Sequence, residues 1–453
     1  MALRSGFTWL SPPIILGAFI LWDFLEHRIS ARNRKRYRGF PVPRPEERAY
    51  SASDVSIIIP TVDTDLAFSE CLGGLLRNRP LEIIIITTEE EEGRVRGLVY
   101  TPAVEGNIGQ TDVRVLTVSK ANKRDQLLRG INESKGGIMA LVDDDAFWEH
   151  DTVLTHLLAP FQQEDIGLVG GPITSYLPMK RQDPRIITPW EVAALRLRGK
   201  RHGSMKSAYA ADGGINFCVS GVTALLRSEI ALDPPFQRAF GNDMWMGRRQ
   251  NSGDDSFITR WVLFQHLFKQ QQQQQRQGDG QRPRQWKLGM QLTKEAEVGT
   301  SIMPDSRFAG QLKRWYRSGL RHRLMCLVYE PGLRAMFKTC PHMTRKMVEG
   351  MLNPVLLWVR LYCFWSTFYV YPWFASFVLG MKIYAYVEGL LDFANEYPFV
   401  KRHLWAAVLV DRLYLVSDWY CWITLGTEAW ITRQAVDDCA TDVVENGNGV
   451  KEE

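Results

Sequence analysis

The sequence lacks several features that would place it in a familiar class at once. Its seven cysteines, at positions 71, 218, 326, 340, 363, 421 and 439, are scattered and include no C-x-x-C pair. This spacing argues against a zinc site or a disulfide framework and predicts reduced thiols facing the cytosol. The formal net charge of +5 over 453 residues is too small to indicate a nucleic-acid-binding protein.

Common phosphate-binding and catalytic signatures are also missing. The sequence has no glycine-rich phosphate loop, no defensible Ser–His–Asp arrangement and no internal repeat. Its histidines, among them His202 and His322, show no metal-ligand spacing and are more typical of surface or packed residues. These absences leave acidic motifs as the main chemical signal.

Both ends of the chain are rich in apolar residues. Phe7–Leu25 contains Asp23 as its only formal charge and is long enough to cross a bilayer core of about 30 Å as a helix. Basic residues follow at once, namely Arg28, Arg32, Arg34, Lys35, Arg36 and Arg38. The positive-inside rule then predicts a transmembrane helix over residues 1–26 and a basic cytosolic linker over 27–52. A cleaved signal peptide is the alternative, but the basic residues lie after the apolar core and no small-residue cleavage site follows.

The middle of the chain has the pattern of an α/β domain, which we place at residues 53–330. Helical segments such as Ala121–Glu133 lie between short β-branched runs, which are Val55–Ile59, Ile83–Thr87, Val113–Val118 and Ile138–Val142. Strands alternating with helices predict a doubly wound, mostly parallel sheet, which binds ligands at the carboxyl ends of its strands. The expected fold class is therefore α/β with flanking transmembrane helices, and the domain faces the cytosol.

The later segments differ in composition. Lys269–Gln285 is of low complexity and is expected to be a disordered insertion. Pro354–Leu379 contains a single charge and is predicted to span the membrane. Trp405–Ile431 contains four charges, which are costly in lipid unless they face other helices or a polar cavity. We therefore expect interfacial and transmembrane helices over 331–433 and an acidic, disordered tail over 434–453.

The strongest local motif is Asp143-Asp144-Asp145, directly after the run Ile138–Val142. Two carboxylates separated by one residue at the end of a parallel strand can bind a hard divalent cation, which bridges the phosphates of a nucleoside diphosphate. Taken alone, the triplet is equally consistent with a negatively charged turn.

Two further motifs follow along the chain. Gly253-Asp254-Asp255 offers a carboxylate that can act as general base for an acceptor hydroxyl, or simply an acidic helix N-terminus. Gln311-Leu312-Lys313-Arg314-Trp315 combines a charged fork suited to a diphosphate with a flat apolar face suited to a sugar ring. The same pattern also fits a basic amphipathic helix lying on a membrane.

In this order and spacing, D-x-D, G-D-D and Q-x-x-R-W resemble the motifs of the family 2 glycosyltransferases of fold type A. The likeness covers about residues 53–330 and points to the processive membrane branch. That branch includes hyaluronan, chitin and cellulose synthases and the fungal type 2 glycosyltransferases. Gly253–Arg260 followed by Gln311–Trp315 looks most like hyaluronan synthase-type enzymes.

The resemblance implies roles for individual residues. Asp143 and Asp145 would hold Mg²⁺ or Mn²⁺ and the donor diphosphate, Asp255 would be the catalytic base, and Asp254 would shape the acceptor site. The other implied donor-binding residues are Pro60, Thr61, Glu89, Lys123, Arg124, Gln311 and Arg314. Acceptor binding would involve Trp315 together with Ser220 and Gly221, which are expected in a strand within Cys218–Leu226.

Two departures from the family pattern stand out. After the second strand, where the family usually has an acidic residue that reads the uracil, this chain has Thr87-Thr88-Glu89. Either Glu89 makes that contact or the contact is missing. Near the C-terminus, the family's W-G-T-R, in an element near the active-site mouth, appears as Trp430-Ile431-Thr432-Arg433, with Ile431 in place of the glycine.

These observations predict a processive, inverting polysaccharide synthase that uses a UDP-sugar. It would be a multi-pass protein of the plasma membrane, with the Golgi or the endoplasmic reticulum as alternatives. Its expected partners are the lipid bilayer and a glycan or lipid acceptor, and not nucleic acid; a homo-oligomer is left open.

One rival function is transfer of a single sugar to a lipid, as in ceramide glucosyltransferases, which share the motif set and the N-terminal span. The number of C-terminal membrane helices separates the two, because a polymer needs a channel. The other rival is an inactive membrane scaffold, against which the intact motifs argue.

Overall fold

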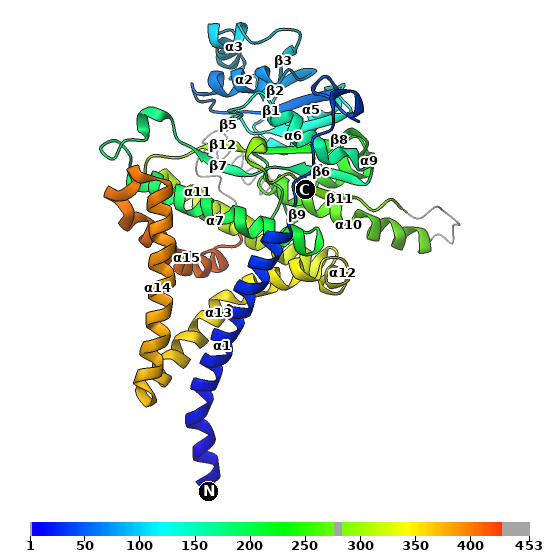
Figure 1. Ribbon diagram of the computed structural model, residues 1–453. Helices are drawn as coiled ribbons and strands as arrows, with labels where there is room; N and C mark the ends of the chain where they lie inside the picture. Colours follow the sequence, from blue (N-terminus) through cyan, green and yellow to red (C-terminus); the bar gives the residue numbers. More distant parts are fainter. Residues whose placement is uncertain (1, 276–282, 428–453) are drawn as a thin grey trace, which may run out of the picture.

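The computed structural model describes residues 2–275 and 283–427, and its upper part is built around a seven-stranded sheet (Figure 1). The strand order is β11-β6-β8-β4-β1-β2-β3. Strand β8 runs antiparallel to β4 and β6, and the other pairs in this sheet are parallel. The strands are β1 (Val55–Pro60), β2 (Glu82–Thr88), β3 (Asp112–Val118), β4 (Ile138–Val142), β6 (Ile166–Gly170), β8 (Thr223–Arg227) and β11 (Lys287–Met290). The predicted α/β class with a mostly parallel sheet is confirmed.

The four strands expected from the sequence are β1 to β4, each within one residue of the predicted ends at either side. Strands β1, β2 and β4 are buried along their whole length. A strand covered on both faces appears in the sequence as a continuous apolar run, and this is why these strands could be recognised. The helix expected after β3 is α5 (Lys123–Glu133), which Asn122 caps by accepting hydrogen bonds from two backbone N–H groups.

Helices cover both faces of the sheet. Ile58 of β1 belongs to the same buried cluster as Leu127 of α5 on one face. Its neighbour Ile57 belongs to a second cluster with Leu72 of α2 (Phe68–Arg77) on the other face. Because successive side chains of a strand point to opposite faces, each strand contributes to both layers, and the sheet is doubly wound.

A second, three-stranded sheet continues from the acidic triplet. It consists of β5 (Ala146–Phe147), β12 (Val298–Ser301) and β7 (Ile173–Tyr176), in that order. Strand β5 begins directly after Asp145 and pairs antiparallel with β12, where Thr300 lies opposite Ala146. This pairing fixes the segment that follows β4 and brings β12 to the same edge.

Long helices lie below the sheet: α7 (Pro189–Asp212), α10 (Asp254–Gln275), α11 (Arg307–Leu324) and α15 (Leu404–Ile423) (Figure 1). A capping box between Thr188 and Glu191 starts α7. Helix α10 is longer than expected, and it corrects the prediction of disorder for the first part of Lys269–Gln285. Glutamine is a good helix former, and a helix already begun extends readily. Residues 276–282 lie outside the described part of the chain.

The shorter elements complete the fold. They are α3 (Glu92–Val99), α4 (Pro102–Glu105), α6 (Val153–Leu158), α8 (Ser228–Ala231), α9 (Pro234–Gly241), α12 (Leu333–Thr339), the π-helical turn Met325–Tyr329, and the hairpin of β9 (Met244–Trp245) and β10 (Arg248–Arg249).

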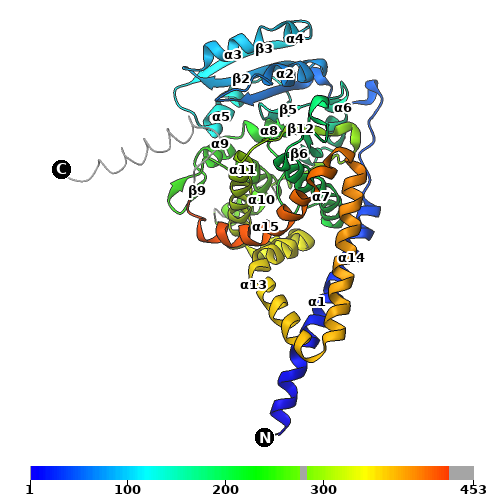
Figure 2. The same cartoon turned by 90° about the vertical axis from the view of Figure 1, so that its left-hand side faces the viewer.

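Three long helices project from the α/β body: α1 (Ala2–Arg36), α13 (Pro341–Val370) and α14 (Pro372–Glu396) (Figures 1 and 2). Helix α1 packs against α13. Asp23 of α1 forms ion pairs with Arg360 of α13 at 3.0 Å and with Lys382 of α14 at 2.6 Å. The charges that interrupt the apolar stretches of these helices therefore lie against one another.

The helix boundaries correct the predicted membrane segments. Helix α1 continues to Arg36, through the first part of the expected linker at 27–52. The predicted span Pro354–Leu379 is divided between two helices, because Tyr371 leaves the helical conformation before Pro372. Within the described residues, α14 is the one helix whose length and apolar composition would allow it to cross a membrane.

The predicted segment Trp405–Ile431 corresponds to α15, which packs against α7 and α11. Its Asp411 pairs with Arg196 of α7 at 3.1 Å and with Lys200 at 2.5 Å. This charge therefore faces the α/β body. Trp430–Arg433 and the acidic tail lie outside the described residues.

Candidate active site

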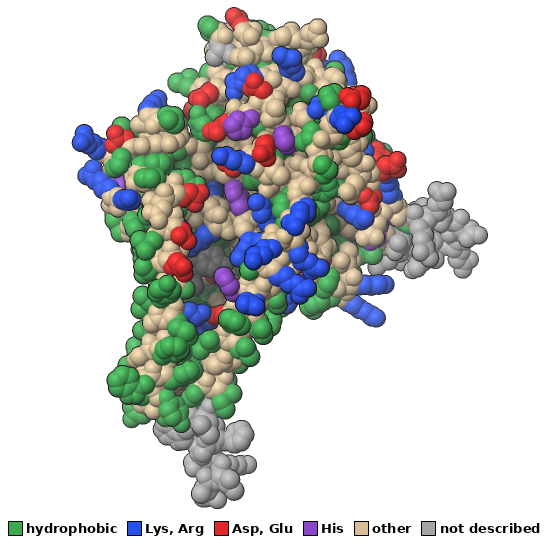
Figure 3. Space-filling view, in the orientation of Figure 1, with side chains coloured by type: hydrophobic (Ala, Val, Ile, Leu, Met, Phe, Trp, Pro, Cys, Tyr) green, Lys and Arg blue, Asp and Glu red, His purple; other side chains and the backbone are tan. Residues whose placement is uncertain are grey.

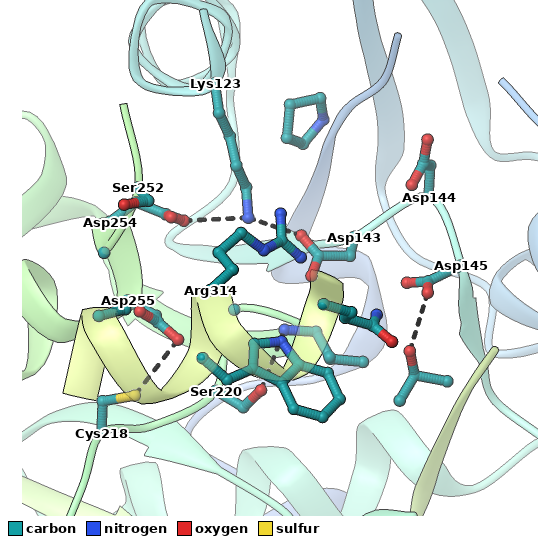
Figure 4. A pocket seen from close by; sticks show the side chains of 18 of the residues that line it. Lys123, Asp143, Asp144, Asp145, Cys218, Ser220, Ser252, Asp254, Asp255 and Arg314 are labelled. Carbon is teal, nitrogen blue, oxygen red and sulfur yellow. Dashed lines mark hydrogen bonds and ion pairs between the residues drawn. The ribbon is translucent and has the colours of Figure 1, made fainter. Parts of the chain in front are cut away.

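One pocket brings the three motifs together, at the carboxyl end of β4 and beside α11 (Figure 4). All the predicted site residues except Glu89 and Arg124 line it. They are Pro60, Thr61, Lys123, Asp143, Asp145, Ser220, Gly221, Asp254, Asp255, Gln311, Arg314 and Trp315. Segments far apart in the chain thus meet where the fold of an α/β sheet places its ligand.

The three carboxylates of the acidic triplet have different partners. Asp143 accepts a hydrogen bond from Nζ of Lys123 at 2.7 Å, and Asp144 accepts one from Oγ1 of Thr61 at 2.6 Å. Asp145 accepts one from Oγ1 of Thr300 at 2.9 Å. Asp144 is therefore bound to the residue that follows β1, whereas Asp143 and Asp145 are bound to side chains of α5 and β12.

Lys123 connects the first motif with the second. Its ammonium group lies 2.7 Å from Asp143 and 3.1 Å from Asp254 (Figure 4). Burial works against the charged form of this lysine, but the two carboxylates outweigh it and raise its pKa above the ordinary value. Lys123 is therefore a fixed positive charge between the D-x-D and G-D-D motifs.

The second motif lies where the chain turns into α10. Gly253 adopts a φ of 79°, which an L side chain rarely adopts, and this turn places Asp254 and Asp255 at the start of the helix. Oδ2 of Asp255 accepts a hydrogen bond from Sγ of Cys218 at 3.2 Å (Figure 4). Burial and the neighbouring charge of Asp254 raise the pKa of Asp255. A carboxylate with a raised pKa is better suited to accept a proton.

The third motif presents one face of α11 to the pocket. Gln311, Arg314 and Trp315 are spaced by three and four residues, so they lie on the same side of the helix. The ring of Trp315 packs edge-on against Phe308. One face of the ring lies under the guanidinium of Arg198 from α7, 4.6 Å from the ring centroid, so sugar stacking would use the other face.

The structure does not bring Glu89 and Arg124 to the pocket. Glu89 is exposed beyond the end of β2. Arg124 is buried and points the other way, where its guanidinium pairs with Asp243 at 2.9 Å and donates to the backbone oxygen of Phe240 at 3.0 Å. Side chains of adjacent residues on a helix point in different directions, so Lys123 and Arg124 cannot both face the donor. Ser220 and Gly221 lie in the loop before β8 and not in a strand.

Several pocket residues were not identified from the sequence. Arg198 and Arg201 of α7 line the pocket, as do Thr300 and the thiol-bearing Cys218. The basic run along α7 was a detectable signal for the two arginines. Cys218 and Thr300 carried no local pattern, because their importance depends on contacts with Asp255 and Asp145 across the fold.

The carboxylate oxygens of the acidic triplet are ligands of the kind that a divalent cation prefers. Asp143 and Asp145 offer hard oxygen ligands, and burial together with repulsion from Asp145 raises the pKa of Asp143 to about 6, although Lys123 opposes this. A cation would relieve that repulsion. No cluster of three His, Cys, Asp or Glu side chains suited to a metal occurs in the described part of the chain. Two carboxylates would therefore hold Mg²⁺ or Mn²⁺ together with other oxygens, such as those of a diphosphate.

Nucleotide-sugar transferases with a type A fold have a mostly parallel α/β sheet with these motifs at its carboxyl edge. The fold and the site of this chain place it in that class. The model of the family described as glycosyltransferase like family 2 matches residues 52–285. The chain belongs to this family.

Two relatives agree with this assignment, and a solved structure shares the fold. The chain is 35% identical to the NDP-glycosyltransferase ltbB of Aspergillus luteorubrus over 93% of this chain and 97% of that protein. It is 33% identical to a type 2 glycosyltransferase of Zymoseptoria tritici over 70% of this chain and 59% of that longer protein. Its fold resembles the mannosyltransferase PcManGT of Pyrobaculum calidifontis, with a TM-score of 0.51 and 14% identity over 88% of this chain and 97% of that one.

Proposed function

We propose that the chain is a membrane-bound, inverting glycosyltransferase that moves a sugar from a UDP-sugar to a growing polysaccharide. One observation carries the proposal: D-x-D, G-D-D and the Q-x-x-R-W face of α11 line a single pocket. Support for a nucleoside diphosphate donor comes from ltbB, which is named an NDP-glycosyltransferase. PcManGT, which shares the fold, was determined in complex with GDP-Man and Mn²⁺.

In the proposed reaction, Asp255 takes the proton of an acceptor hydroxyl. The hydroxyl oxygen attacks the anomeric carbon of the donor sugar, and the bond from that carbon to the diphosphate oxygen breaks, so UDP leaves with the electron pair. Arg314 and Lys123 place positive charge beside the departing diphosphate. Mg²⁺ or Mn²⁺ at Asp143 and Asp145 would add further positive charge there.

The projecting helices support a membrane location. Many of their aromatic side chains face outward; Trp365 is 64% exposed, Tyr369 83% and Trp373 88%. Figure 3 shows hydrophobic side chains covering the part that projects at the lower left of the molecule. Exposed apolar surface of this extent is typical of contact with lipid or protein. Pairing of Asp23 with Arg360 and Lys382 lowers the cost of placing these charges in a bilayer.

A second candidate function is transfer of a single sugar to a lipid. It is favoured by the finding that α14 is the one helix in the described residues that passes the length and composition test for a membrane span. A polymer that crosses the bilayer needs a channel lined by several helices, in this chain or in an oligomer.

The test is to incubate the full-length protein in membranes with a panel of UDP-sugars and to measure both UDP release and product mass. A polysaccharide synthase yields a product of high mass with one or two of these donors. A monoglycosylated lipid as the main product would replace the polymer by the second candidate. No UDP release from any UDP-sugar, with release of another nucleoside diphosphate, would refute the choice of donor.

A further inference from the structure

Helix α7 brings two arginines to the wall between the active-site pocket and a second cavity. Arg198 and Arg201 are three residues apart, so they lie on one face of the helix. The second cavity has a volume of about 460 Å³ and is lined by α7, α11 and α15. Four residues line both spaces: Arg198, Arg201, Phe217 and Trp315. The two cavities therefore adjoin at this wall.

The wall is built from two stacked pairs. The guanidinium of Arg198 lies 4.6 Å from the centroid of the Trp315 ring, and that of Arg201 lies 5.0 Å from the centroid of the Phe217 ring. A guanidinium stacked on an aromatic face keeps its N–H groups at its edge, where they can still donate hydrogen bonds. The arrangement thus places a planar cation on one face of the Trp315 ring, whose other face is the one proposed to stack on a sugar.

Arg198 is a buried cation, and no carboxylate of the described residues is in contact with it. Its side chain is only 6% exposed. Across residues 2–275 and 283–427, no carboxylate lies within ion-pair distance of it; Asp143 and Asp145 attract it only from farther away. Burial and the nearby Arg201 lower its pKa to about 10, so it remains charged at neutral pH.

Two other buried arginines of this chain form ion pairs with carboxylates. Arg196, two residues earlier on the same helix, pairs with Asp411 at 3.1 Å. Arg124 pairs with Asp243 at 2.9 Å. A buried charge without such a partner is strongly unfavourable, so its position on the wall of a reaction pocket indicates an anionic ligand at that point.

We propose that Arg198, with Arg201 beside it, binds a carboxylate or phosphate group carried by the acceptor. This rests on the proposed function, since it names the acceptor's charge. The acceptor side is indicated because Arg198 stacks on Trp315 and lines the second cavity as well, whereas Lys123, Gln311 and Arg314, which are assigned to the donor diphosphate, line only the active-site pocket of the two. The acceptor is therefore an acidic sugar or a phosphate-bearing molecule, since a neutral one would leave Arg198 without an anionic partner among the described residues.

The test uses two pairs of small probes that differ in charge. Phenyl β-glucuronide and phenyl β-glucoside differ by a carboxylate, and glucose 6-phosphate and glucose differ by a phosphate. Equilibrium binding of each probe is measured with the full-length protein in phosphatidylcholine nanodiscs. UDP binding is measured on the same samples. We expect the acidic member of one pair to bind about tenfold more tightly than its neutral partner, and the pair that shows this identifies the anion.

Three variants complete the design. In Arg198→Gln the preference for the acidic probe should disappear while UDP binding persists, and in Arg198→Lys part of the preference should remain. Arg248→Gln, at an exposed arginine outside both cavities, should behave as the wild type. The proposal is overturned if the wild type shows no preference in either pair. It is also overturned if Arg198→Gln loses UDP binding, since the arginine would then serve the donor. Because binding is measured without turnover, absence of UDP release would refute the proposed function separately.

Discussion

Asp255→Asn is the sharpest test of the proposed chemistry, because the amide keeps the shape of the carboxylate but cannot take a proton. In the structure Asp255 accepts hydrogen bonds from the backbone N–H of Ser256 at 2.7 Å and from Sγ of Cys218 at 3.2 Å. An asparagine oxygen can keep one of these bonds, so the loop and helix α10 should persist. A general base typically contributes about 10²–10⁴-fold, and kcat should fall by at least about a hundredfold. UDP binding should change little, since Asp143 and Asp145 are untouched.

The pH profile adds a second measurement of the same residue. Asp255 acts as a base only when ionised, and burial together with the charge of Asp254 raises its pKa. The kcat/KM of the wild type should therefore fall with decreasing pH at a higher pH than an ordinary aspartate would produce. The thiol of Cys218 donates to the ionised carboxylate and lowers this pKa. In Cys218→Ala the acid limb should move to higher pH, whereas Cys218→Ser, which keeps a donor, should leave it close to that of the wild type.

The assay is UDP release by full-length protein in membranes over a range of pH, with product mass measured in parallel. UDP affinity and the melting temperature show whether each variant is folded. The reasoning is refuted if Asp255→Asn keeps more than a few per cent of wild-type transfer. It is equally refuted if the acid limb of Cys218→Ala moves to lower pH.

Three further predictions concern the remaining parts of the site. Asp145→Asn should weaken metal-dependent UDP binding, and excess chelator should silence the wild type; full activity in chelator would remove the metal from the mechanism. Trp315→Ala should lose about 1–3 kcal/mol of stacking, or roughly tenfold in acceptor retention, so it should release UDP slowly and make little long product. Long product from this variant would contradict the role of Trp315. Arg124→Met should lower the free energy of unfolding by about 3–5 kcal/mol, because Asp243 loses its nearer buried cation, while UDP affinity is kept. A variant that is as stable as the wild type but cannot bind UDP would return Arg124 to the donor site.

The core strands and the acidic triplet could be predicted because their signals are local. Strands β1, β2 and β4 are covered on both faces, so burial forces each of them to be a continuous apolar run. In a parallel α/β sheet, residues that follow such a run lie at the ligand-binding edge. This rule assigns Asp143 and Asp145 to that edge from their position after β4 alone. The break at Tyr371–Pro372 is also encoded locally, because the residue before a proline disfavours the helical conformation; the apolar composition continues across the break, and the predicted span therefore extends past it.

The α/β sheet, the position of D-x-D after β4, and the helical spacing that puts Gln311, Arg314 and Trp315 on one face all follow from local patterns in the chain. Which neighbouring side chains reach the site depends on how distant segments pack together. Lys123 and Arg124 are adjacent and both basic, yet one reaches Asp143 and the other Asp243. Likewise, the role proposed for Arg198 depends on its stacking against Trp315, which is more than a hundred residues away along the chain. The hydrophobic periodicity of a segment reflects which of its own faces are buried, so it can be recognised in the sequence. The direction in which a buried charged side chain points depends on which partner the packing of distant segments brings within a few ångströms, and the sequence of one segment does not contain this information.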